Sequence, residues 1–308
     1  HFESQISLPF IDGTGAWHIL SAPNWLPPST GLLAAFLRFD PATWRDAVGL
    51  RRIQPYFDEP PADITVSQWL DTCKQSSSIR TTFWNPLCLS VMNASPEIAP
   101  ARELVAVLSE AFAQQGGANM GWATTGLSET YAAQSRAYIE QRGGHVTTGA
   151  YVSSVEQANK GIAVGTRDQT GGETKAVILA VPPPRASSLL PPALKSLADQ
   201  LKHLVPSPIL GINLWFNRPL IDEPFVGLLG GMIEWVFNRA ELTGRKNPDT
   251  GYHHSLVVSA SGDLLSEPDS VLVQLALDDL RRAELIDQDE SPLRSLVVHE
   301  KRATYVRP

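Results

Sequence analysis

The 308-residue sequence predicts an α+β fold, in which a helical segment is followed by a sheet with mainly antiparallel strands. Helical periodicity dominates the first part and is clearest over residues 100–115, where Leu104, Val105 and Leu108 lie on one wide apolar face. In the centre, the period of the apolar residues changes from about 3.6 to two. Strand-like runs dominate the last third, separated by turns and one helix.

The first part of the chain is expected to form a strand pair followed by helices. Residues 2–10 and 16–20 read as two strands across a turn at Asp12-Gly13. Asp40 precedes Pro41, which predicts that Asp40 caps the second helix. Gly116-Gly117 predicts the end of the fourth. The helical patterns cover residues 30–39, 41–53, 65–75, 100–115 and 128–141.

In the centre of the chain, the pattern of residues 138–184 predicts the end of a helix followed by a three-stranded meander. Gly143-Gly144 ends the helix, because glycine tolerates the left-handed conformation found past helix ends. Strands are expected around Val152, at 162–164 and at 177–181. The last run, Val-Ile-Leu-Ala-Val, has no polar alternation and is therefore expected to be buried on both faces.

The last part predicts an antiparallel sheet with two helices. Ser266 is the expected N-cap of the second helix, whose apolar residues recur at helical spacing. The expected strands cover residues 208–216, 232–237, 255–260 and 293–305, and the expected helices cover 193–204 and 268–284.

Composition and charge exclude several classes of partner. A net charge of -7, without a Lys/Arg cluster, argues against nucleic acid as a partner. Charged residues make up 19% of the chain, below the roughly 25% usual in soluble domains, so apolar surface is expected. Two cysteines without metal-ligand spacing, Cys73 and Cys88, indicate buried thiols in a reducing compartment, which predicts a cytoplasmic protein.

No apolar run of this sequence is long enough to span a membrane as a helix. The longest nearly apolar run, residues 225–237, is shorter than the roughly 20 residues of a spanning helix. The helical segment 30–39 carries few charges and follows Trp25-Leu26-Pro27-Pro28, which leaves peripheral contact with the inner membrane face open. The alternative is that this helix packs against its own domain.

Common catalytic motifs are scarce. No G-x-S-x-G elbow supports a hydrolase. His253 and His254 are adjacent in a strand and point to opposite faces, so they cannot share a metal ion, and no metal site is predicted. The acidic runs 278–279 and 287–290 are expected to be solvated surface.

The centre of the chain resembles a known family. A helix, Arg142-Gly143-Gly144, a strand with Val152, a hairpin and then Val177-Ile178-Leu179-Ala180-Val181-Pro182-Pro183 resemble the flavin amine oxidase and carotenoid desaturase superfamily. The resemblance implies that the main chain of Val152 holds the adenine end of FAD. It also implies that the strand ending in Ala180, Val181 and Pro182 passes below the flavin.

Four further stretches are similar to the squalene-associated subfamily, the hydroxysqualene dehydroxylases. They are Phe83–Leu89 with Asn93, Leu214–Pro219, Glu234–Arg239 and Glu300–Tyr305. This likeness suggests that Trp84, Trp215, Trp235 and Phe237 line a tunnel for a long isoprenoid. Asn85, Asn93 and Asn238 are candidates to hold a substrate hydroxyl. The alternatives are that the tryptophans fill a core and that the amides satisfy buried backbone groups.

Two motifs of the family are absent from this sequence, the G-x-G-x-x-G turn and the closing Gly-Asp motif. The chain is therefore expected to be the middle of a longer polypeptide that by itself binds FAD weakly or not at all. The expected domains are a substrate domain formed by residues 1–118 and 193–308, and a partial FAD-binding domain formed by residues 119–192.

The first functional hypothesis is an FAD-dependent oxidoreductase of isoprenoid biosynthesis that replaces the hydroxyl of hydroxysqualene by hydride to give squalene. A carotenoid or phytoene desaturase and an amine oxidase, in which hydride moves from substrate to flavin, are alternatives within the same family. An alternative of another class is a non-catalytic lipid-binding module. No catalytic residue can be named from the sequence.

Overall fold

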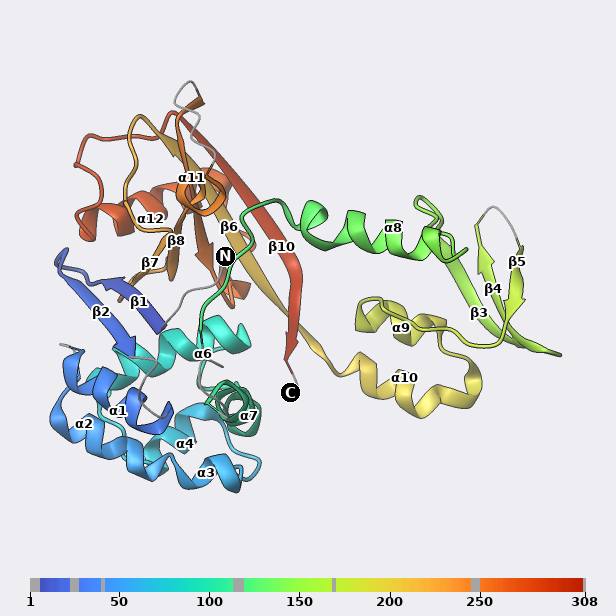
Figure 1. Cartoon of the computed structure of the whole chain (residues 1–308), viewed down its shortest axis with the longest axis horizontal. Coiled ribbons are helices and arrows are strands. Elements are labelled where there is room, and N and C mark those ends of the chain that lie inside the picture. Colours follow the sequence, from blue (N-terminus) through green and yellow to red (C-terminus); the bar gives the residue numbers. More distant parts are fainter. Residues whose placement is uncertain are drawn as a thin grey trace. The chain divides into compact units, whose positions relative to one another are not determined.

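Two sheets of different size organise the described part of the chain (Figure 1). The structure is a computed structural model that describes residues 6–22, 28–39, 42–112, 119–167, 170–244 and 250–306. The chain divides into two compact units, which we call the sheet unit (residues 1–125 and 206–304) and the meander unit (residues 126–205 and 305–308). The predicted α+β class is confirmed, whereas the domain boundaries near 118 and 192 stay predictions.

The sheet unit contains a seven-stranded sheet with the order β10-β6-β9-β8-β7-β1-β2. β1 pairs antiparallel with β2, β6 with β9, and β8 with both β7 and β9, whereas β1 and β7 run parallel. The six strand regions predicted for this sheet are confirmed, and sequence reasoning missed β7. The strands are β1 (Ile6–Ile11), β2 (Trp17–Ala22), β6 (Val205–Phe216), β7 (Phe225–Leu228), β8 (Trp235–Asn238), β9 (Tyr252–Val258) and β10 (Arg294–Val306).

Asp12 closes the β1–β2 hairpin at the predicted turn. Its Oδ1 accepts hydrogen bonds from the Thr14 hydroxyl and from the Thr14 and Ala16 amides. Its Oδ2 lies 2.9 Å from His18 Nε2. The hydrogen bond to His18, followed by those to Thr14, holds the pKa of the Asp12 carboxyl well below its usual range. These contacts fix the register of the two strands.

Capping boxes begin two helices of the sheet unit. At α2 the pair is Thr43 with Asp46, and each side chain accepts from the backbone amide of the other. Thr65 pairs with Gln68 in the same way at α4. The prediction that Asp40 caps the second helix is wrong, because the reciprocal bonds start it at Trp44; Asp40 itself lies outside the described residues. The helices of this part are α1 (Pro28–Arg38), α2 (Trp44–Gly49), α3 (Pro55–Asp58), α4 (Val66–Thr72), α5 (Ser77–Ile79), α6 (Asn85–Met92) and α7 (Ala101–Phe112).

Trp84 lies in the core of the helical part. A π-helical turn, Arg80–Trp84, joins α5 to α6 and brings the Trp84 ring within 5.8 Å of Trp69 and 4.8 Å of Phe83, measured between ring centroids. The Trp84 indole Nε1 donates a hydrogen bond to Gln75 Oε1 at 3.0 Å. The indole donor is therefore satisfied inside the core.

Both cysteines are buried and carry free thiols. Burial raises the pKa of the Cys73 thiol to about 11 and that of Cys88 to about 12. The prediction of buried thiols is confirmed. Both thiols are therefore unreactive at neutral pH.

The described helices include none that is both long and apolar enough to cross a membrane. Helix α1 forms where the sequence predicts it, and its Ala35 and Phe36 side chains are buried while Leu37 is exposed. Trp25 and the side chains of Leu32 and Leu33 lie outside what the structure describes. The buried residues match the alternative of packing within the domain, and peripheral membrane contact stays a prediction.

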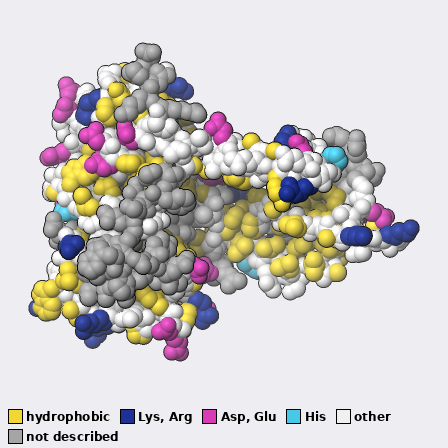
Figure 2. Space-filling model, in the orientation of Figure 1, with side chains coloured by type: hydrophobic (Ala, Val, Ile, Leu, Met, Phe, Trp, Pro, Cys, Tyr) yellow, Lys and Arg dark blue, Asp and Glu magenta, His cyan; other side chains and the backbone are white. Residues whose placement is uncertain are grey.

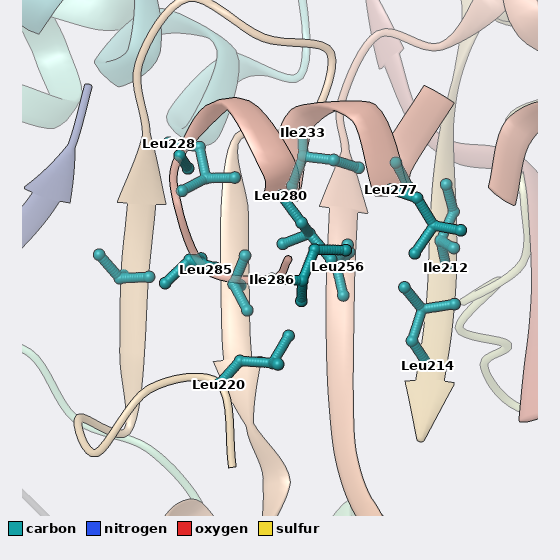
Figure 3. Packing of buried hydrophobic residues seen from close by; sticks show 14 of the residues in the cluster. Ile212, Leu214, Leu220, Leu228, Ile233, Leu256, Leu277, Leu280, Leu285 and Ile286 are labelled. Carbon is teal, nitrogen blue, oxygen red and sulfur yellow. The ribbon is translucent and has the colours of Figure 1, made fainter. Parts of the chain in front are cut away.

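A hydrophobic core of the sheet unit lies between the sheet and helix α12 (Asp269–Arg282), as Figure 3 shows. Alternate residues of β6 face this helix, among them Ile212 and Leu214. Asp279 on α12 accepts a hydrogen bond from the Ile233 amide at 2.8 Å. The predicted cap Ser266 is wrong: the carbonyl of Pro268 accepts the first helical bond, so Ser266 is too far from the helix start to cap it.

The Asn93 side chain joins helix α6 to the sheet. Asn93 ends α6 in the left-handed conformation, with φ 48. Its Nδ2 donates to the Ser207 carbonyl at 3.0 Å and to Thr304 Oγ1 at 2.9 Å. Its Oδ1 accepts from the Ala260 amide at 2.6 Å. One buried amide thus links α6 to β6, to β10 and to the end of β9.

The meander unit contains a three-stranded antiparallel sheet with the order β3-β4-β5. Gly143 and Gly144 follow the C-cap Arg142 of helix α8, and Gly143 has the left-handed conformation expected past a helix end. The prediction of a buried strand at 177–181 is wrong, because the third strand forms at Thr170–Thr174 instead and Ile178 is 93% exposed. The elements are α8 (Ala133–Gln141), β3 (Val152–Ala158), β4 (Gly161–Thr166), β5 (Thr170–Thr174), α9 (Pro183–Leu189) and α10 (Lys195–Lys202).

The segment 176–181 lacks strand structure for a physical reason. A strand requires a neighbour for its backbone groups, and no strand described in the structure lies beside this segment. Figure 2 shows apolar side chains gathered over one face of the meander unit. Among the described residues of this unit, the exposed large apolar side chains are Leu127, Tyr131, Tyr138, Ile139, Tyr151, Ile178, Val181, Leu194, Leu197 and Val205.

We predict that Asn93→Ala lowers the free energy of unfolding by about 3 kcal/mol. The change leaves the Ala260 amide and the Ser207 carbonyl without the Asn93 side chain, and unsatisfied buried groups cost about 1–3 kcal/mol each. It also places a Cβ-bearing residue without a polar side chain at φ 48. Urea denaturation followed by circular dichroism measures the loss.

Asn93→Gly separates the two causes, since glycine accepts the left-handed backbone. We expect Asn93→Gly to recover only about 1 kcal/mol relative to Asn93→Ala. Lys74→Gly, at another position with φ 54, is the matched control and should stabilise the protein slightly. Full recovery in Asn93→Gly would contradict the role of the hydrogen bonds.

We predict that the free energy of unfolding falls between pH 6.5 and pH 4, with His254 as a main cause. The His254 ring is fully buried, and its Nε2 accepts a hydrogen bond from the Leu220 amide at 3.2 Å. Burial lowers the pKa of His254 to about 4. The unfolded chain, with a histidine pKa near 6.5, binds more protons in this window, so acid favours unfolding by on the order of 3 kcal/mol.

Urea denaturation at pH 7 and pH 4 measures this loss. His254→Gln keeps an acceptor but does not titrate, so its stability should depend less on pH than that of the unmodified protein. His299→Gln, a change at a ring with Asp269 as its partner, is the control and should keep most of the dependence. An unchanged pH dependence in His254→Gln would refute the prediction.

Candidate functional site

The candidate site lies on the face of the seven-stranded sheet opposite α12. Because side chains alternate along a strand, neighbours of the core residues point to this second face. Gly227 pairs with both Phe10 and Trp235, and Phe225 pairs with Phe237. Together with Trp215 of β6, these side chains form what we call the aromatic face, which consists of Phe10, Trp215, Phe225, Trp235 and Phe237.

Contacts between rings order the aromatic face. Trp235 lies 5.6 Å from Phe10 and 5.9 Å from Phe225, and Phe225 lies 6.1 Å from Phe237, between ring centroids. A Cβ on Gly227 would come within 2.5 Å of the Phe10 ring, so glycine is what lets the rings of Phe10 and Trp235 meet. The Trp235 indole donates to Ser90 Oγ on α6 at 2.8 Å. The polar edge of this ring is thereby anchored to α6.

Three polar side chains interrupt the aromatic face, all on β6 and β9. Asn213 pairs with Ser255, and Trp215 pairs with His253. The His253 and Trp215 rings stack at 4.3 Å with an angle of 8°. His253 Nε2 lies 2.9 Å from Asn213 Oδ1. Burial, followed by the charges of Arg239 and Arg294, lowers the pKa of His253 to about 4, so the ring is neutral at neutral pH.

Sequence reasoning rejected a shared metal ion for His253 and His254, favoured a structural or surface role for them, and did not select Asn213 or Ser255. The described residues contain no group of three or more His, Cys, Asp or Glu side chains that could hold a metal ion. The signal that could have found the three residues is alternation: Asn213 and Trp215 share one face of β6, and His253 and Ser255 share one face of β9.

The predicted substrate residues are spread over three environments. Trp215, Trp235 and Phe237 lie together on the aromatic face. Trp84 lies in the helical core, and Asn85 is half-buried at the start of α6. Their contact with substrate stays a prediction.

Two of the predicted asparagines bind other parts of the protein. Asn93 has the three partners described above. Asn238 Nδ2 donates to the Ile221 carbonyl at 2.7 Å, and its Oδ1 caps α11 (Arg239–Thr243) by accepting from the Ala240 and Glu241 amides. These contacts match the alternative in which the amides satisfy buried backbone groups.

The predicted cofactor residues lie close together in the meander unit. Arg185, in the first turn of α9, donates a hydrogen bond to the Val152 carbonyl. Its amide donates to the Pro182 carbonyl at 2.8 Å. One residue therefore links the two segments that the resemblance assigns to FAD. Ala180, Val181 and Pro182 are exposed and precede α9.

The main chain of Val152 has a backbone group that could bind FAD. Tyr151 and Arg167 are hydrogen-bonded opposite one another, so the backbone groups of the next residue, Val152, point to the outer edge of β3. Arg185 donates a hydrogen bond to the Val152 carbonyl. The Val152 amide is therefore the backbone group that can contact an adenine ring. The residues thus fit FAD through the Val152 amide and the exposed segment 180–182.

Comparisons with known proteins identify the family of this chain. The family model for flavin containing amine oxidoreductases matches residues 26–301. A hydroxysqualene dehydroxylase from Sinorhizobium fredii is 27% identical over 231 residues, which cover 71% of this chain and 49% of that protein. The chain thus spans about half the length of this curated relative.

Solved structures share the fold at low identity. An oxidoreductase from Methanosarcina mazei has a TM-score of 0.74 at 15% identity, over 98% of this chain and 71% of that one. Cyclohexylamine oxidase from Brevibacterium oxydans has a TM-score of 0.65 at 14% identity, over 100% of this chain and 72% of that one. The predicted superfamily is confirmed: this chain belongs to the family of flavin-containing amine oxidoreductases.

Proposed function

We propose that the chain is the substrate-binding part of an FAD-dependent oxidoreductase that acts on a long isoprenoid. The aromatic face carries this proposal, because five aromatic rings around a few polar groups suit a ligand with large apolar area and few hydrogen-bonding groups. The specific reaction we propose is the conversion of hydroxysqualene to squalene. The similarity to a hydroxysqualene dehydroxylase supports this choice of substrate.

The residues of the chain would bind and orient the substrate and exclude water. The half-buried rings of Trp215, Trp235 and Phe237 would offer apolar surface to methyl and alkene groups. The buried rings of Phe10 and Phe225 contact Trp235 from within the protein and support it. The Trp235–Ser90 hydrogen bond fixes the orientation of the largest ring. When bound, reduced flavin supplies the hydride that replaces the hydroxyl group. The hydroxyl group would leave as water after it takes up a proton, and a dry apolar surface would keep further water from the carbocation that remains.

The meander unit would hold the cofactor through Val152 and residues 180–182. We propose that the 308-residue chain binds FAD weakly, because its sequence lacks a G-x-G-x-x-G turn and Arg185 already takes the Val152 carbonyl. A purified chain that keeps stoichiometric flavin after gel filtration, judged by its absorbance, would contradict this part of the proposal.

We predict that Trp235→Ala and Phe237→Ala each weaken the binding of squalene about 10- to 100-fold. Removing a buried aromatic ring from an apolar contact costs roughly 1.5–3 kcal/mol, which corresponds to that range. Equilibrium binding of radiolabelled squalene delivered from detergent micelles measures the affinity. Trp44→Ala, at an exposed indole on α2, is the control and should bind like the unmodified protein.

Equal losses in the control and in the two face variants, or no loss in either, would refute the aromatic face as the binding surface. Incubation with hydroxysqualene and reduced FAD, followed by mass spectrometry of the products, tests the reaction. Squalene as product supports the proposed conversion, whereas new double bonds formed in a parallel incubation with oxidised FAD would favour a desaturase instead. Binding of squalene without turnover in the full-length parent would favour a lipid-binding module.

A further inference from the structure

We infer that Asn213, His253 and Ser255 form a binding site for the single hydroxyl group of an otherwise apolar ligand. This inference rests on the proposed function, because it takes the aromatic face as the surface that binds the ligand. It adds the group of residues that recognises the polar end of that ligand. The three side chains lie next to Trp215 on neighbouring strands β6 and β9.

The positions of the three residues follow from strand register. Asn213 and Ser255 are directly opposite, so their Cβ atoms are about 5 Å apart. His253 and Ser255 are two residues apart on β9 and share a face. His253 reaches back to Asn213 through the 2.9 Å hydrogen bond and is held flat on Trp215 by stacking. The group is therefore fixed in orientation before any ligand binds.

The hydrogen-bond partners determine the tautomer of His253. Asn213 Nδ2 donates to the Leu296 carbonyl at 3.5 Å, so its Oδ1 faces His253 as an acceptor. His253 Nε2 must then carry the proton, and Nδ1 presents a lone pair. The lowered pKa of His253 keeps the ring in this neutral form at neutral pH.

Two polar atoms are left for a ligand. Among the described residues, neither His253 Nδ1 nor Ser255 Oγ has a hydrogen-bond partner, and both residues are half-buried. His253 Nδ1 accepts a hydrogen bond, and the Ser255 hydroxyl can donate or accept one. An alcohol is both donor and acceptor, so it satisfies both atoms, whereas a hydrocarbon would cover them without any bond.

The difference between alcohol and hydrocarbon binding bears on the proposed reaction, whose substrate is an alcohol and whose product is a hydrocarbon. Loss of the hydroxyl group removes the part of the ligand that these residues recognise. The hydrocarbon product then leaves His253 Nδ1 and Ser255 Oγ unsatisfied beneath it, which weakens product binding relative to substrate binding. The same residues would thus select the alcohol and favour release of the product.

The test compares hydroxysqualene with squalene, delivered from the same detergent micelles, by equilibrium binding of the radiolabelled ligands to the full chain. We expect the unmodified protein to bind the alcohol about tenfold more tightly. Ser255→Ala and His253→Phe should reduce this ratio to about one, through a weaker affinity for the alcohol and an equal or higher affinity for squalene. His253→Phe keeps a ring on Trp215, so the squalene affinity also reports whether the face remains folded.

His299→Phe is the matched control, since it removes a ring nitrogen that contacts Asp269 on α12 and should leave the ratio at about ten. Equal affinity of the unmodified protein for both ligands would overturn the hydroxyl site and leave the aromatic face standing. A tenfold ratio that survives in both variants would overturn it as well. If neither ligand binds, the proposed function fails together with this inference.

Discussion

The amide of Asn93 is the contact on which the arrangement of the sheet unit depends. It ends α6 and bonds to β6, to β10 and to the chain after β9. Helix α6 contributes Ser90, which holds the indole of Trp235, so the position of the aromatic face depends on where α6 lies. A buried amide with every partner satisfied can fix such a junction, because each misplacement would leave a buried polar group unpaired.

The sheet separates stability from recognition by means of strand alternation. On β9, His254 and Leu256 face the core with α12, whereas His253 and Ser255 face the opposite side. The same residue type thus has two roles at adjacent positions. His254 satisfies a buried backbone amide, and His253 stacks on Trp215 and offers a nitrogen to a ligand. Changes on the second face therefore need not affect the main core.

The local part of the fold could be predicted, and the long-range part could not. Alternation and helical period found β6, β9, α7 and α12, because each pattern is complete within its own segment. The strand predicted at 177–181 failed because its formation depends on a neighbouring strand. The family resemblance predicted that both Trp84 and Trp235 line a substrate tunnel, yet Trp84 lies in the helical core and Trp235 lies on the aromatic face. Residue type alone could not separate them.

The two units differ in how far they supply their own stability. The sheet unit has a large core between the sheet and α12, whereas the meander unit buries few side chains and exposes Ile178 and Val181. Any ligand that covers the segment 176–182 removes apolar area from water, so its binding and the stability of this unit are linked. The aromatic face does not depend on a bound ligand for its stability, because its rings lie on a sheet that has its own core. On the proposed function, substrate binding is therefore separable from cofactor binding, and only turnover requires both.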